Sequence, residues 1–574
     1  MARANDEVAD LLQELADLLS ITGGEAYKIR AYEKAVRAIA GYPEDVSRLS
    51  LGQLKKIPTV GDAIAKKILD YNATGTIRQV EDLRAQIPAG VRALTAIPTL
   101  GPRKALALYE ELGVSSVPEL AEAITAGRLR DLKGFGAKSE DNILRGIELM
   151  KQAGGRVLID QATELAEEIV AALAPLAERC AYAGSLRRMR ETIGDIDILA
   201  AAPSSAELME TFATLPYVSE VIVRGEKKTS VRTGARGQGL QVDLRVVPLE
   251  SWGAALQYFT GSKEHNVRTR EIAVRAGLKL SEYGLYEVES GALVVSATEE
   301  EVYQRLGLPW IPPTLREDGG EIQAALAGEL PRLVEVGDLR GDLHTHTDLT
   351  DGTASLQDMV AAAAGLGHEY YAITDHAPNL YMQRMTDEKM LAQREAVRAL
   401  QERFPDLTLL HGTELNIDPA GEVDWDAGFL AGFDLCVASV HSAFTQDPEE
   451  MTRRFVTACE NPYVNVIGHP TARLIGRRPP VDADWDEVFR ACAATGTALE
   501  IDAFPDRLDL PAGLIRRALR HGVKFSIDSD AHAVGHLGNL RYGVGTAQRG
   551  WLTPDDVINT WPLDRLRAFL RKGR

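Results

Sequence analysis

The sequence of 574 residues contains little cysteine and no long hydrophobic run. Its four cysteines, Cys180, Cys436, Cys459 and Cys492, lie far apart and form no CxxC pair, which argues against a disulfide framework and a cysteine zinc site. No stretch approaches the roughly 20 apolar residues that a membrane span needs. The first residues also lack the basic and then apolar order of a signal peptide, so we expect a cytoplasmic protein.

Positive charge is also scarce, because 64 lysines and arginines face 83 aspartates and glutamates, giving a formal net charge of −19. Such a chain is an unfavourable partner for nucleic acid, whose phosphates attract positive charge. The acidic excess lies mainly towards the C-terminus, however, and residues 51–150 are slightly positive. The hydrophobic share of 45% excludes a largely disordered chain, and the length corresponds to about three to five domains.

Helical periodicity fills residues 1–150, which contain a weak threefold repeat. The repeat occurs at residues 57–61, 97–101 and 132–136, and each copy ends in an apolar residue followed by a glycine that opens a helical run. Backbone N–H groups at such a helix start can bind a phosphate. One copy would equally fit a turn between inert helices, but three resemble the helix-hairpin-helix modules of DNA repair proteins. The resemblance implies DNA contacts at Val60, Gly61, Leu100, Gly101, Phe135 and Gly136.

Residues 151–335 alternate between strand-like and helical patterns and predict a separate α/β domain. A Gly184-Ser185 turn precedes a strand in which Asp195 and Asp197, two residues apart, share one face. Asp243 stands in another apolar strand, where an unpaired carboxylate is costly to bury. Oxygen ligands at this density suit Mg²⁺ or Mn²⁺ and an in-line phosphoryl transfer. Solvated aspartates at strand ends are the alternative for the Asp-x-Asp pair by itself.

This arrangement resembles the nucleotidyltransferase signature, and the match continues through Tyr258-Phe-Thr-Gly-Ser-Lys263-Glu-His. Residues 1–335 resemble the DNA polymerase X family, and Lys263-Glu-His is similar to its bacterial branch. The resemblance implies that Asp195 and Asp197 bind two metal ions, while Asp243 binds the catalytic ion and helps to deprotonate the primer 3′-hydroxyl. It also implies contacts with the nucleotide and template by Ser185, Arg188, Gly194, Tyr258, Phe259, Gly261, Lys263, Asn266 and Arg270, with His265 as a further neighbour.

Two segments near the start resemble the small lyase domain of DNA polymerase beta. By that resemblance Lys67 stands where the Schiff-base lysine stands, and Lys28 and Tyr32 also match. A lysine nucleophile must lose its proton, which requires desolvation or nearby cations, and Lys66 and Lys28 can supply the cations. Gln79 replaces an accompanying lysine, so a lysine that only binds phosphate is the alternative.

Ten of the eleven histidines follow residue 340, within a pattern of alternating strands and helices that predicts a βα barrel. His344 and His346 point to one side of a strand end, which indicates a metal site. Mixed histidine and carboxylate ligands favour Zn²⁺, Mn²⁺ or Fe²⁺ over Ca²⁺. Further candidate ligands recur at likely strand ends, namely Asp375, His376, Glu414, His441, His469, Asp530 and His532.

Residues 338 to about 570 closely resemble the PHP (polymerase and histidinol phosphatase) family. That resemblance implies a distorted (β/α)7 barrel that binds up to three ions. By the resemblance, the nine ligands are all present, which implies an active phosphoesterase: His344, His346, Asp351, His376, Glu414, His441, His469, Asp530 and His532. Arg473 is a candidate for holding a substrate phosphate by its planar fork. The remaining histidines of this region, which fit no ligand position, are expected to be structural: His368, His411, His521 and His536.

These observations predict a multidomain chain with an all-α N-terminal region, an α/β nucleotidyltransferase core and a C-terminal PHP barrel. The expected units are a lyase-type helical domain with the first helix-hairpin-helix (1–85), a fingers-like region with two more (86–154), a palm and thumb-like domain (155–318), a linker (319–337) and the PHP domain (338–574). DNA contact is also expected at Arg224, Lys227, Lys228 and Arg232.

The expected function is template-directed filling of short DNA gaps in repair, with metal-dependent 3′–5′ exonuclease and AP endonuclease or 3′-phosphatase activity in the PHP domain. Gapped or nicked DNA and dNTP are the expected partners of a monomer. Mg²⁺ or Mn²⁺ would serve the polymerase site, and Mn²⁺, Zn²⁺ or Fe²⁺ the PHP site. The alternatives are a PHP domain that hydrolyses a small phosphate ester, a DNA-end scaffold with weak catalysis, and nucleotide transfer without a template.

Overall fold

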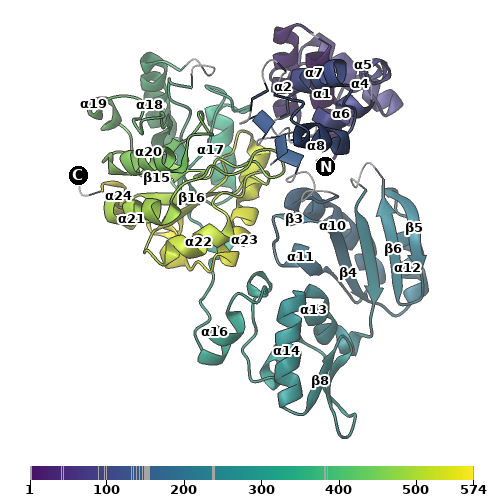
Figure 1. Cartoon of the computed structure of the whole chain (residues 1–574). Coiled ribbons are helices and arrows are strands. Elements are labelled where there is room, and N and C mark those ends of the chain that lie inside the picture. The colour runs from purple at the N-terminus through teal and green to yellow at the C-terminus, as the bar shows by residue number, and fades with distance from the viewer. Residues whose placement is uncertain are drawn as a thin grey trace.

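The computed structural model describes residues 3–572 except 23, 41, 43, 88, 96, 98–99, 131, 133–134, 137–138, 141–142, 145, 148–154, 235–238, 381–382 and 384. It consists of an N-terminal helical unit, a central five-stranded sheet, a small three-stranded unit and a C-terminal seven-stranded barrel (Figure 1). None of the helices in this part of the chain has the length and apolarity that a membrane crossing requires.

The N-terminal helical unit is built around one apolar core to which every long helix contributes. Gly61 and Gly101 of the first two repeats are the residues immediately before α4 and α7, as the sequence predicted. Much of the segment after Gly136 lies outside the described residues. The helices are α1 (Arg3–Ile21), α2 (Ala26–Ala40), α3 (Leu51–Leu54), α4 (Asp62–Thr74), α5 (Arg78–Gln86), α6 (Ala89–Thr95), α7 (Pro102–Leu112) and α8 (Val117–Thr125).

The central domain is a five-stranded sheet in the order β2-β4-β7-β6-β5, in which only β4 and β7 run parallel. Ile196 and Ile198 on β4 are fully buried, and Asp197 between them faces the other side of the sheet. The alternation of the strand therefore decides which face carries the polar groups. The elements are α10 (Ile159–Leu173), β2 (Arg179–Tyr182), α11 (Gly184–Arg187), β4 (Asp195–Ala201), α12 (Ser205–Ala213), β5 (Val218–Arg224), β6 (Lys228–Thr233) and β7 (Gln241–Val246); β1 (Val157–Leu158) pairs separately with β3 (Thr192–Ile193).

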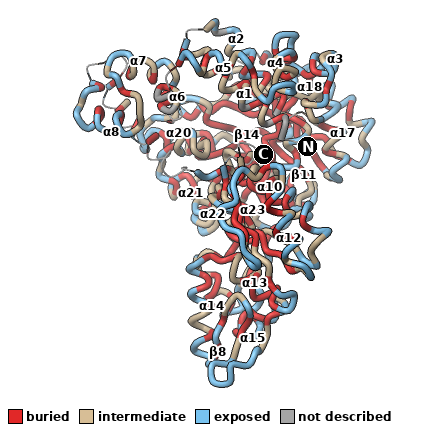
Figure 2. The backbone as a smooth tube through the Cα atoms, turned by 90° about the vertical axis from the view of Figure 1, so that its right-hand side faces the viewer, coloured by how far each residue is buried: buried red, intermediate tan, exposed pale blue. Residues whose placement is uncertain are grey.

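A small unit follows the central sheet and projects from the rest of the molecule (Figure 2). Residues 319–337, predicted as a linker, contain the helix α16, whose Ile322 and Ala325 pack into the apolar core of this unit. The segment is therefore part of the small unit and not only a linker. The elements are α13 (Trp252–Thr260), α14 (Lys263–Arg275), β8 (Leu278–Ser281), β9 (Gly284–Glu287), β10 (Leu293–Val295), α15 (Glu299–Arg305) and α16 (Glu321–Ala327).

The C-terminal domain confirms the predicted (β/α)7 barrel. Seven parallel strands run in chain order, and a bridge between Thr345 and Ala531 nearly closes the ring. The strands are buried on both faces, as is usual for parallel sheets covered by helices. They are β11 (Gly341–Asp342), β12 (Tyr370–Ile373), β13 (Thr408–Asn416), β14 (Leu435–Ser439), β15 (Val466–Gly468), β16 (Ala498–Asp502) and β17 (Phe525–Asp528), and the helices are α17 (Leu356–Gly365), α18 (Asp387–Gln401), α19 (Ala427–Leu430), α20 (Pro448–Glu460), α21 (Trp485–Thr495), α22 (Ala512–Leu519), α23 (Leu540–Arg549) and α24 (Leu563–Leu570).

The barrel helix α23 packs between the barrel wall and the central domain. Two glycines allow this close packing: a side chain at Gly543 would meet Ala503 at 2.7 Å, and one at Gly545 would meet Met189 at 2.5 Å. Tyr542 of this helix and Leu508 of the barrel belong to the apolar cluster of the central domain. The two domains therefore share part of one core.

Candidate active sites

The central sheet brings together the three aspartates that the sequence indicated. Asp197 on β4 and Asp243 on β7 are direct partners in the parallel register, and Asp195 lies two residues before Asp197. Gly184, at the start of α11, has a left-handed φ of +62°, and a Cβ there would lie 2.4 Å from a carboxylate oxygen of Asp197. The glycine thus allows the Gly184-Ser185 turn to lie directly against the acidic strand.

The surroundings of Asp197 and Asp243 shift the pKa values of these two carboxyls in opposite directions. Burial, together with the neighbouring Asp195 and Asp243, raises the pKa of Asp197 to about 6. Although burial raises the pKa of Asp243, hydrogen bonding with Lys228 holds it below its ordinary value. Gln241 donates to the other oxygen of Asp243 at 3.0 Å. Closely placed carboxylates that resist joint ionisation fit a site for divalent cations.

The basic residues expected to contact DNA lie beside acids or, for Lys227, beside an aromatic ring. The Lys228 ammonium lies 2.6 Å from Asp243, and Arg224 pairs with Glu210. Arg232 lies 3.9 Å from Glu220, while Lys227 stacks over the Tyr283 ring at 6.0 Å. Lys228 and Arg232 meet their acids because β5, β6 and β7 are neighbours in the sheet, whereas Glu210 lies on α12.

Arg188 is placed beside the predicted sugar-sensing turn. Its Nη1 donates to the carbonyl oxygen of Thr260 at 2.5 Å, and a Cβ at Gly261 would lie 3.1 Å from the same nitrogen. Ser185 lies in α11 just before Arg188, whereas Gly194 lies between β3 and β4. The sequence-predicted triphosphate residues thus flank the strand that carries the aspartates.

The predicted turn is supported by residues of α13 and α14. Asn266 is buried and donates to the carbonyl oxygen of Tyr258 at 2.7 Å, and Arg270 lies over the Tyr258 ring at 5.7 Å. The Tyr258 and Phe259 rings meet edge to face at 5.1 Å. Lys263 begins α14 and is exposed.

The suggestion that His265 lies beside the nucleotide is wrong. Its ring is completely buried between Glu321, 2.6 Å from Nδ1, and the Tyr303 hydroxyl, 2.8 Å from Nε2. Burial lowers the pKa of His265. The histidine therefore joins α14 to α15 and α16 rather than facing a substrate.

The candidate lyase residues lie together in the helical unit, but the charge pattern differs from the prediction. The Lys67 ammonium is 6.0 Å from the Tyr32 ring, and burial lowers the pKa of Lys67. Lys66 pairs with Asp62 at 2.8 Å and Lys28 with Glu25 at 2.5 Å, so neither cation is left to favour deprotonation of Lys67. Desolvation alone accounts for its lowered pKa.

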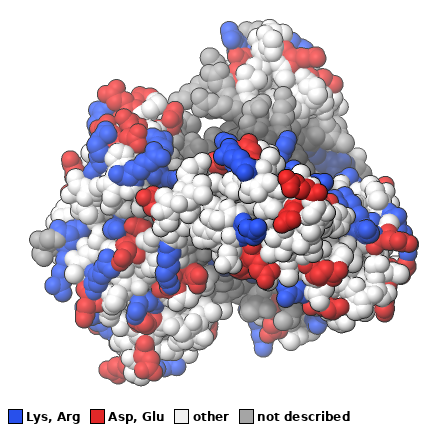
Figure 3. Space-filling view, turned by 90° about the horizontal axis from the view of Figure 1, so that it is seen from below, with Lys and Arg blue, Asp and Glu red and all other residues white. Residues whose placement is uncertain are grey.

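The candidate DNA-binding turns divide into a buried half and an exposed half. The side chains of Val60, Leu100 and Phe135 are buried in the helical core. Gly61, Gly101 and Gly136 are exposed. The apolar residues thus anchor each turn, and the glycines leave its backbone accessible. Exposed backbone amides at a helix start can bind a phosphate without a basic patch. On the opposite face of the molecule, seen from below in Figure 3, basic and acidic side chains are interspersed.

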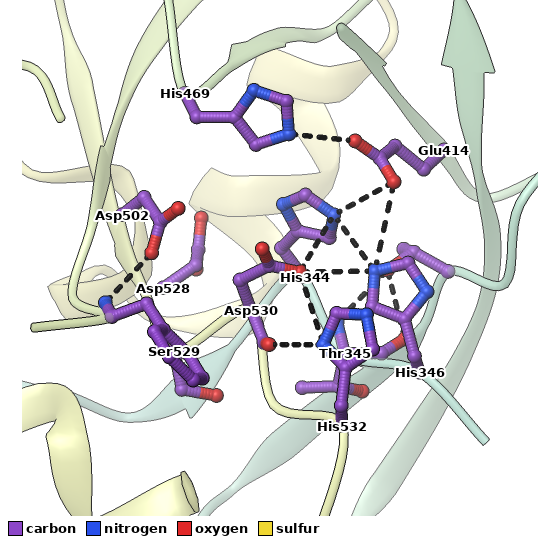
Figure 4. Close-up of polar contacts among 12 residues, drawn as sticks. His344, Thr345, His346, Glu414, His469, Asp502, Asp528, Ser529, Asp530 and His532 are labelled. Carbon is purple, nitrogen blue, oxygen red and sulfur yellow. Dashed lines mark hydrogen bonds and ion pairs between the residues drawn. The ribbon is translucent and has the colours of Figure 1, made fainter. Parts of the chain in front are cut away.

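The barrel brings all nine predicted ligands to one end, where the carboxyl ends of its parallel strands converge. Figure 4 shows His344, His346, Glu414, His469, Asp530 and His532 gathered there. Their nitrogen and oxygen atoms form overlapping groups within 4.8 Å. His469, though not in these groups, lies 3.0 Å from Glu414. The groups are His346, Asp351, His376 and His532; His344, His346 and Asp530; and His376, Glu414 and His441.

Glu414 is the carboxylate at the centre of this cluster. One of its oxygens lies 2.8 Å from Nδ1 of His376, and the other lies 3.1 Å from Nε2 of His441 and 3.0 Å from Nε2 of His469. Although burial opposes ionisation, His441 and His376 hold the pKa of the Glu414 carboxyl well below its usual range. This carboxylate is therefore available as an anionic ligand.

Facing imidazole nitrogens show that the cluster fits metal ions. Nε2 of His346 lies only 3.2 Å from Nε2 of His344, and both rings are fully buried. Among the described residues, Nδ1 of His346 is buried without a hydrogen-bond partner. A buried polar atom without a partner is costly, and a cation between these nitrogens and the carboxylates would satisfy them together.

Sequence analysis missed the acid that holds two of these histidines. Glu500 on β16 lies 2.7 Å from Nδ1 of His344, and its second oxygen accepts from the backbone N–H of His469 at 2.5 Å. Fixing Nδ1 of His344 turns Nε2 towards the centre of the cluster. The signal was present in the sequence, because Glu500 is a charged residue inside an apolar strand, as Asp243 is.

Arg473 does not face the metal cluster, contrary to expectation. It donates to Glu191 of the central domain at 2.7 Å and to the carbonyl oxygens of Arg507 and Leu508. Arg507 instead lines the cavity of about 450 Å³ at the cluster, as do His536 and Val36 of α2. The segment after β15 carries Arg473 to the domain interface, where the acid of the neighbouring domain attracts it.

Comparisons with known proteins agree with the division of the chain into a helical region, a central domain with its small unit, and a barrel. Residues 3–77 match a helix-hairpin-helix domain, residues 91–148 a SAM-like helix-hairpin-helix tandem, residues 255–317 the DNA polymerase beta thumb and residues 342–503 the PHP domain. The DNA polymerase/3′–5′ exonuclease PolX of Bacillus subtilis is 35% identical over 570 residues, which cover 99% of both chains.

Two further relatives each match one part of the chain. DNA polymerase lambda of Rattus norvegicus is 25% identical over 341 residues, covering 54% of this chain and 56% of its own. A probable phosphatase of Thermoanaerobacter sp. (strain X514) is 27% identical over 245 residues, covering 41% of this chain and 95% of its own.

Proposed function

Because the chain belongs to the family X DNA polymerases that carry a C-terminal PHP domain, we propose that it fills short DNA gaps with its central domain and trims 3′ ends with its barrel. One observation carries this proposal: the chain holds two separate acidic centres. The first is formed by Asp195, Asp197 and Asp243 beside the Gly184-Ser185 turn, and the second by the nine ligands of the barrel.

In the central site, the residues divide between binding the triphosphate and preparing the primer. The phosphates bind to Arg188, to Ser185 and to the backbone at the start of α11. A triphosphate requires several positively charged groups and N–H donors. Asp243 helps to remove the proton of the primer 3′-hydroxyl, and Tyr258 and Phe259 contact the sugar. Mg²⁺ or Mn²⁺ held by the three aspartates would neutralise the charge that develops during transfer.

In the barrel, the histidines and carboxylates would hold up to three Mn²⁺, Zn²⁺ or Fe²⁺ ions, which supply Lewis-acid chemistry for phosphate-ester hydrolysis. Glu414 contacts several of the candidate ligands and would help to hold the ions. Glu500 orients His344. Arg507 lines the cavity and supplies a positive charge for a phosphate.

The same proposal extends to the partners and domains. The exposed turns at Gly61, Gly101 and Gly136 would hold the backbone of gapped or nicked DNA, dNTP would occupy the central site, and Lys67 would act as the lyase nucleophile. The chain would act as a monomer in the cytoplasm. The helical region would end at residue 154, and the palm and thumb-like unit would include α16 and end at residue 337.

The test measures nucleotide incorporation and 3′-end digestion on the same gapped, 3′-labelled DNA, with a series of metal ions. Asp243→Ala abolishes nucleotide incorporation and leaves 3′-end digestion intact, whereas His344→Ala does the reverse. Circular dichroism checks that both variants are folded. Loss of both activities in either folded variant contradicts the two-site proposal.

A second activity, removal of a 3′-phosphate by the barrel, is favoured by the match of 41% of this chain to a probable phosphatase. Turnover of a 3′-phosphorylated oligonucleotide and of histidinol phosphate distinguishes a DNA end from a small ester as substrate. A strong preference for histidinol phosphate would assign the barrel to small molecules.

A further inference from the structure

The carboxylate of Glu317 joins the two catalytic halves of the chain. The same oxygen accepts from Nε of Arg188 at 3.0 Å and from Nη1 of Arg549 at 2.8 Å. Arg190 lies 3.7 Å from the other oxygen. Arg188 and Arg190 belong to the central domain, whereas Arg549 is the last residue of the barrel helix α23.

Arg549 also holds the backbone at Arg188. Its Nη1 donates to the carbonyl oxygen of Arg188 at 2.9 Å, so one guanidinium nitrogen bridges this carbonyl and Glu317. Both arginine side chains are only 13% exposed. Charge-assisted hydrogen bonds with so little access to water are well placed to fix geometry.

The hydrogen bonds of the Arg188 guanidinium show which of its nitrogens is left to bind a ligand. Nε is occupied by Glu317 and Nη1 by Thr260, while among the described residues Nη2 makes no hydrogen bond. The guanidinium plane is therefore held on two sides, with one nitrogen left for an anion. The three arginines around one glutamate leave an excess of positive charge, which favours a phosphate nearby.

We propose that Arg549 is a positioning residue for the nucleotide triphosphate: the barrel, through α23, orients the arginine that binds the phosphates in the central domain. This inference rests on the proposed polymerase function. Without Arg549, Glu317 would keep only central-domain partners and would draw Arg188 towards itself, and the carbonyl of Arg188 would lose its donor. The nucleotide then binds more weakly, while the aspartates that perform the transfer are unchanged.

The central experiment compares Arg549→Met with wild type in single-nucleotide gap filling. We expect the KM for dTTP opposite a template adenine to rise about tenfold and kcat to change less than twofold. Arg549→Lys should give an intermediate KM, because one ammonium can pair with Glu317 but lacks the fork that also reaches the carbonyl. In a Glu317→Gln background, Arg549→Met should raise KM less than twofold, since the shared partner is already neutral.

A binding measurement supplies a readout that does not depend on turnover. With a dideoxy-terminated primer in the gap, the Kd for dTTP in the ternary complex, measured by gel shift, should rise about tenfold in Arg549→Met. Arg541→Met is the matched control. Arg541 lies on the same helix and pairs across the same interface with Glu167 at 3.0 Å. Among the described residues, the hydrogen bonds of its side chain go to Glu167 and Tyr542 and not to the nucleotide site.

The outcomes separate this inference from the proposed function. If wild type does not incorporate dTTP, the proposed function fails. If wild type incorporates it and Arg549→Met keeps the wild-type KM and Kd, the positioning role is refuted. An equal rise in Arg541→Met, or a parallel loss of 3′-end digestion in Arg549→Met, also overturns the inference, because it would reflect general loosening of the interface.

Discussion

The Lys228 ammonium lies 2.6 Å from a carboxylate oxygen of Asp243, across the neighbouring strands β6 and β7. The lysine thus neutralises the acid that is proposed to bind the catalytic ion. Because an ammonium and a divalent cation repel each other, any ion that reaches Asp243 must work against Lys228. The ion pair therefore sets the metal concentration at which the site fills.

Replacing Lys228 by methionine should lower the Mg²⁺ concentration for half-maximal nucleotide incorporation about thirtyfold. Removing a unit charge about 4 Å from a divalent ion in a water-like medium is worth roughly 2 kcal/mol, which corresponds to that factor. Mg²⁺ titration of primer extension measures it. Lys227→Met is the control, because Lys227 lies over Tyr283 rather than on an aspartate. An unchanged or higher Mg²⁺ requirement in Lys228→Met would refute the role of the ion pair.

Asp197→Asn should stabilise the metal-free protein at pH 7.5. The pKa of Asp197 rises from 3.8 to about 6 on folding, so the native state binds a proton more tightly than the unfolded state. Stability therefore falls as pH rises between these values and remains lower above them. Asparagine removes this cost, and we expect a gain of about 1–3 kcal/mol at pH 7.5 that shrinks towards pH 4.

Urea unfolding in the presence of a chelator, followed by tryptophan fluorescence, measures the gain in Asp197→Asn. Val170→Ala on helix α10 of the same domain serves as a comparison, since it should lose stability by a similar amount at every pH. An Asp197→Asn protein no more stable than wild type at pH 7.5 would contradict the raised pKa.

Glu500→Gln should lower the affinity of the barrel for metal ions by 10- to 100-fold, the usual cost of losing the acid behind a ligand histidine. His344 would then no longer be held with Nε2 towards the cluster. Metal content after dialysis, measured by mass spectrometry, and the rate of 3′-end digestion should fall together. Asp509→Asn is the control, because this buried acid bonds to Thr471 rather than to a histidine. Full metal content in Glu500→Gln would show that the histidine needs no such support.

Lys67→Ala should abolish the adduct that borohydride traps between the protein and a 5′ abasic site. Because burial lowers the pKa of Lys67, the trapping rate of wild type should rise with pH and level off below the ordinary lysine pKa of 10.5. Gel electrophoresis of the labelled adduct measures both. Lys66→Ala should trap normally, since Lys66 is exposed and paired with Asp62. Normal trapping by Lys67→Ala would leave Lys67 as a phosphate-binding residue.

The sequence was sufficient to predict the features that depend on local spacing. The two-residue period of β4 indicated that Asp195 and Asp197 share a face, and the positions of histidines at strand ends indicated where the barrel ligands converge. In both cases the regular geometry of a strand converts spacing into direction. The barrel itself followed from the alternation of strands and helices.

Side-chain contacts between residues that are far apart in the sequence could not be predicted in the same way. Whether Lys228 faces DNA or Asp243 depends on which strands are neighbours. Glu500 reaches His344 only because the ring nearly closes, which brings β11 beside β17, the neighbour of β16. Arg473 turned towards Glu191, which lies 282 residues away in the sequence. These choices are decided by long-range packing, which local patterns do not contain.

The sharing of Leu508 and Tyr542 with the core of the central domain limits how the two enzymes can be taken apart. A fragment that ends before the barrel would leave a hollow where these side chains lie, next to the strand that carries Asp195 and Asp197. Transplanting the polymerase half into another protein would thus require a substitute for this surface of the barrel. The polymerase half and the barrel are therefore better regarded as one structural unit with a shared core than as two independent domains joined by a linker.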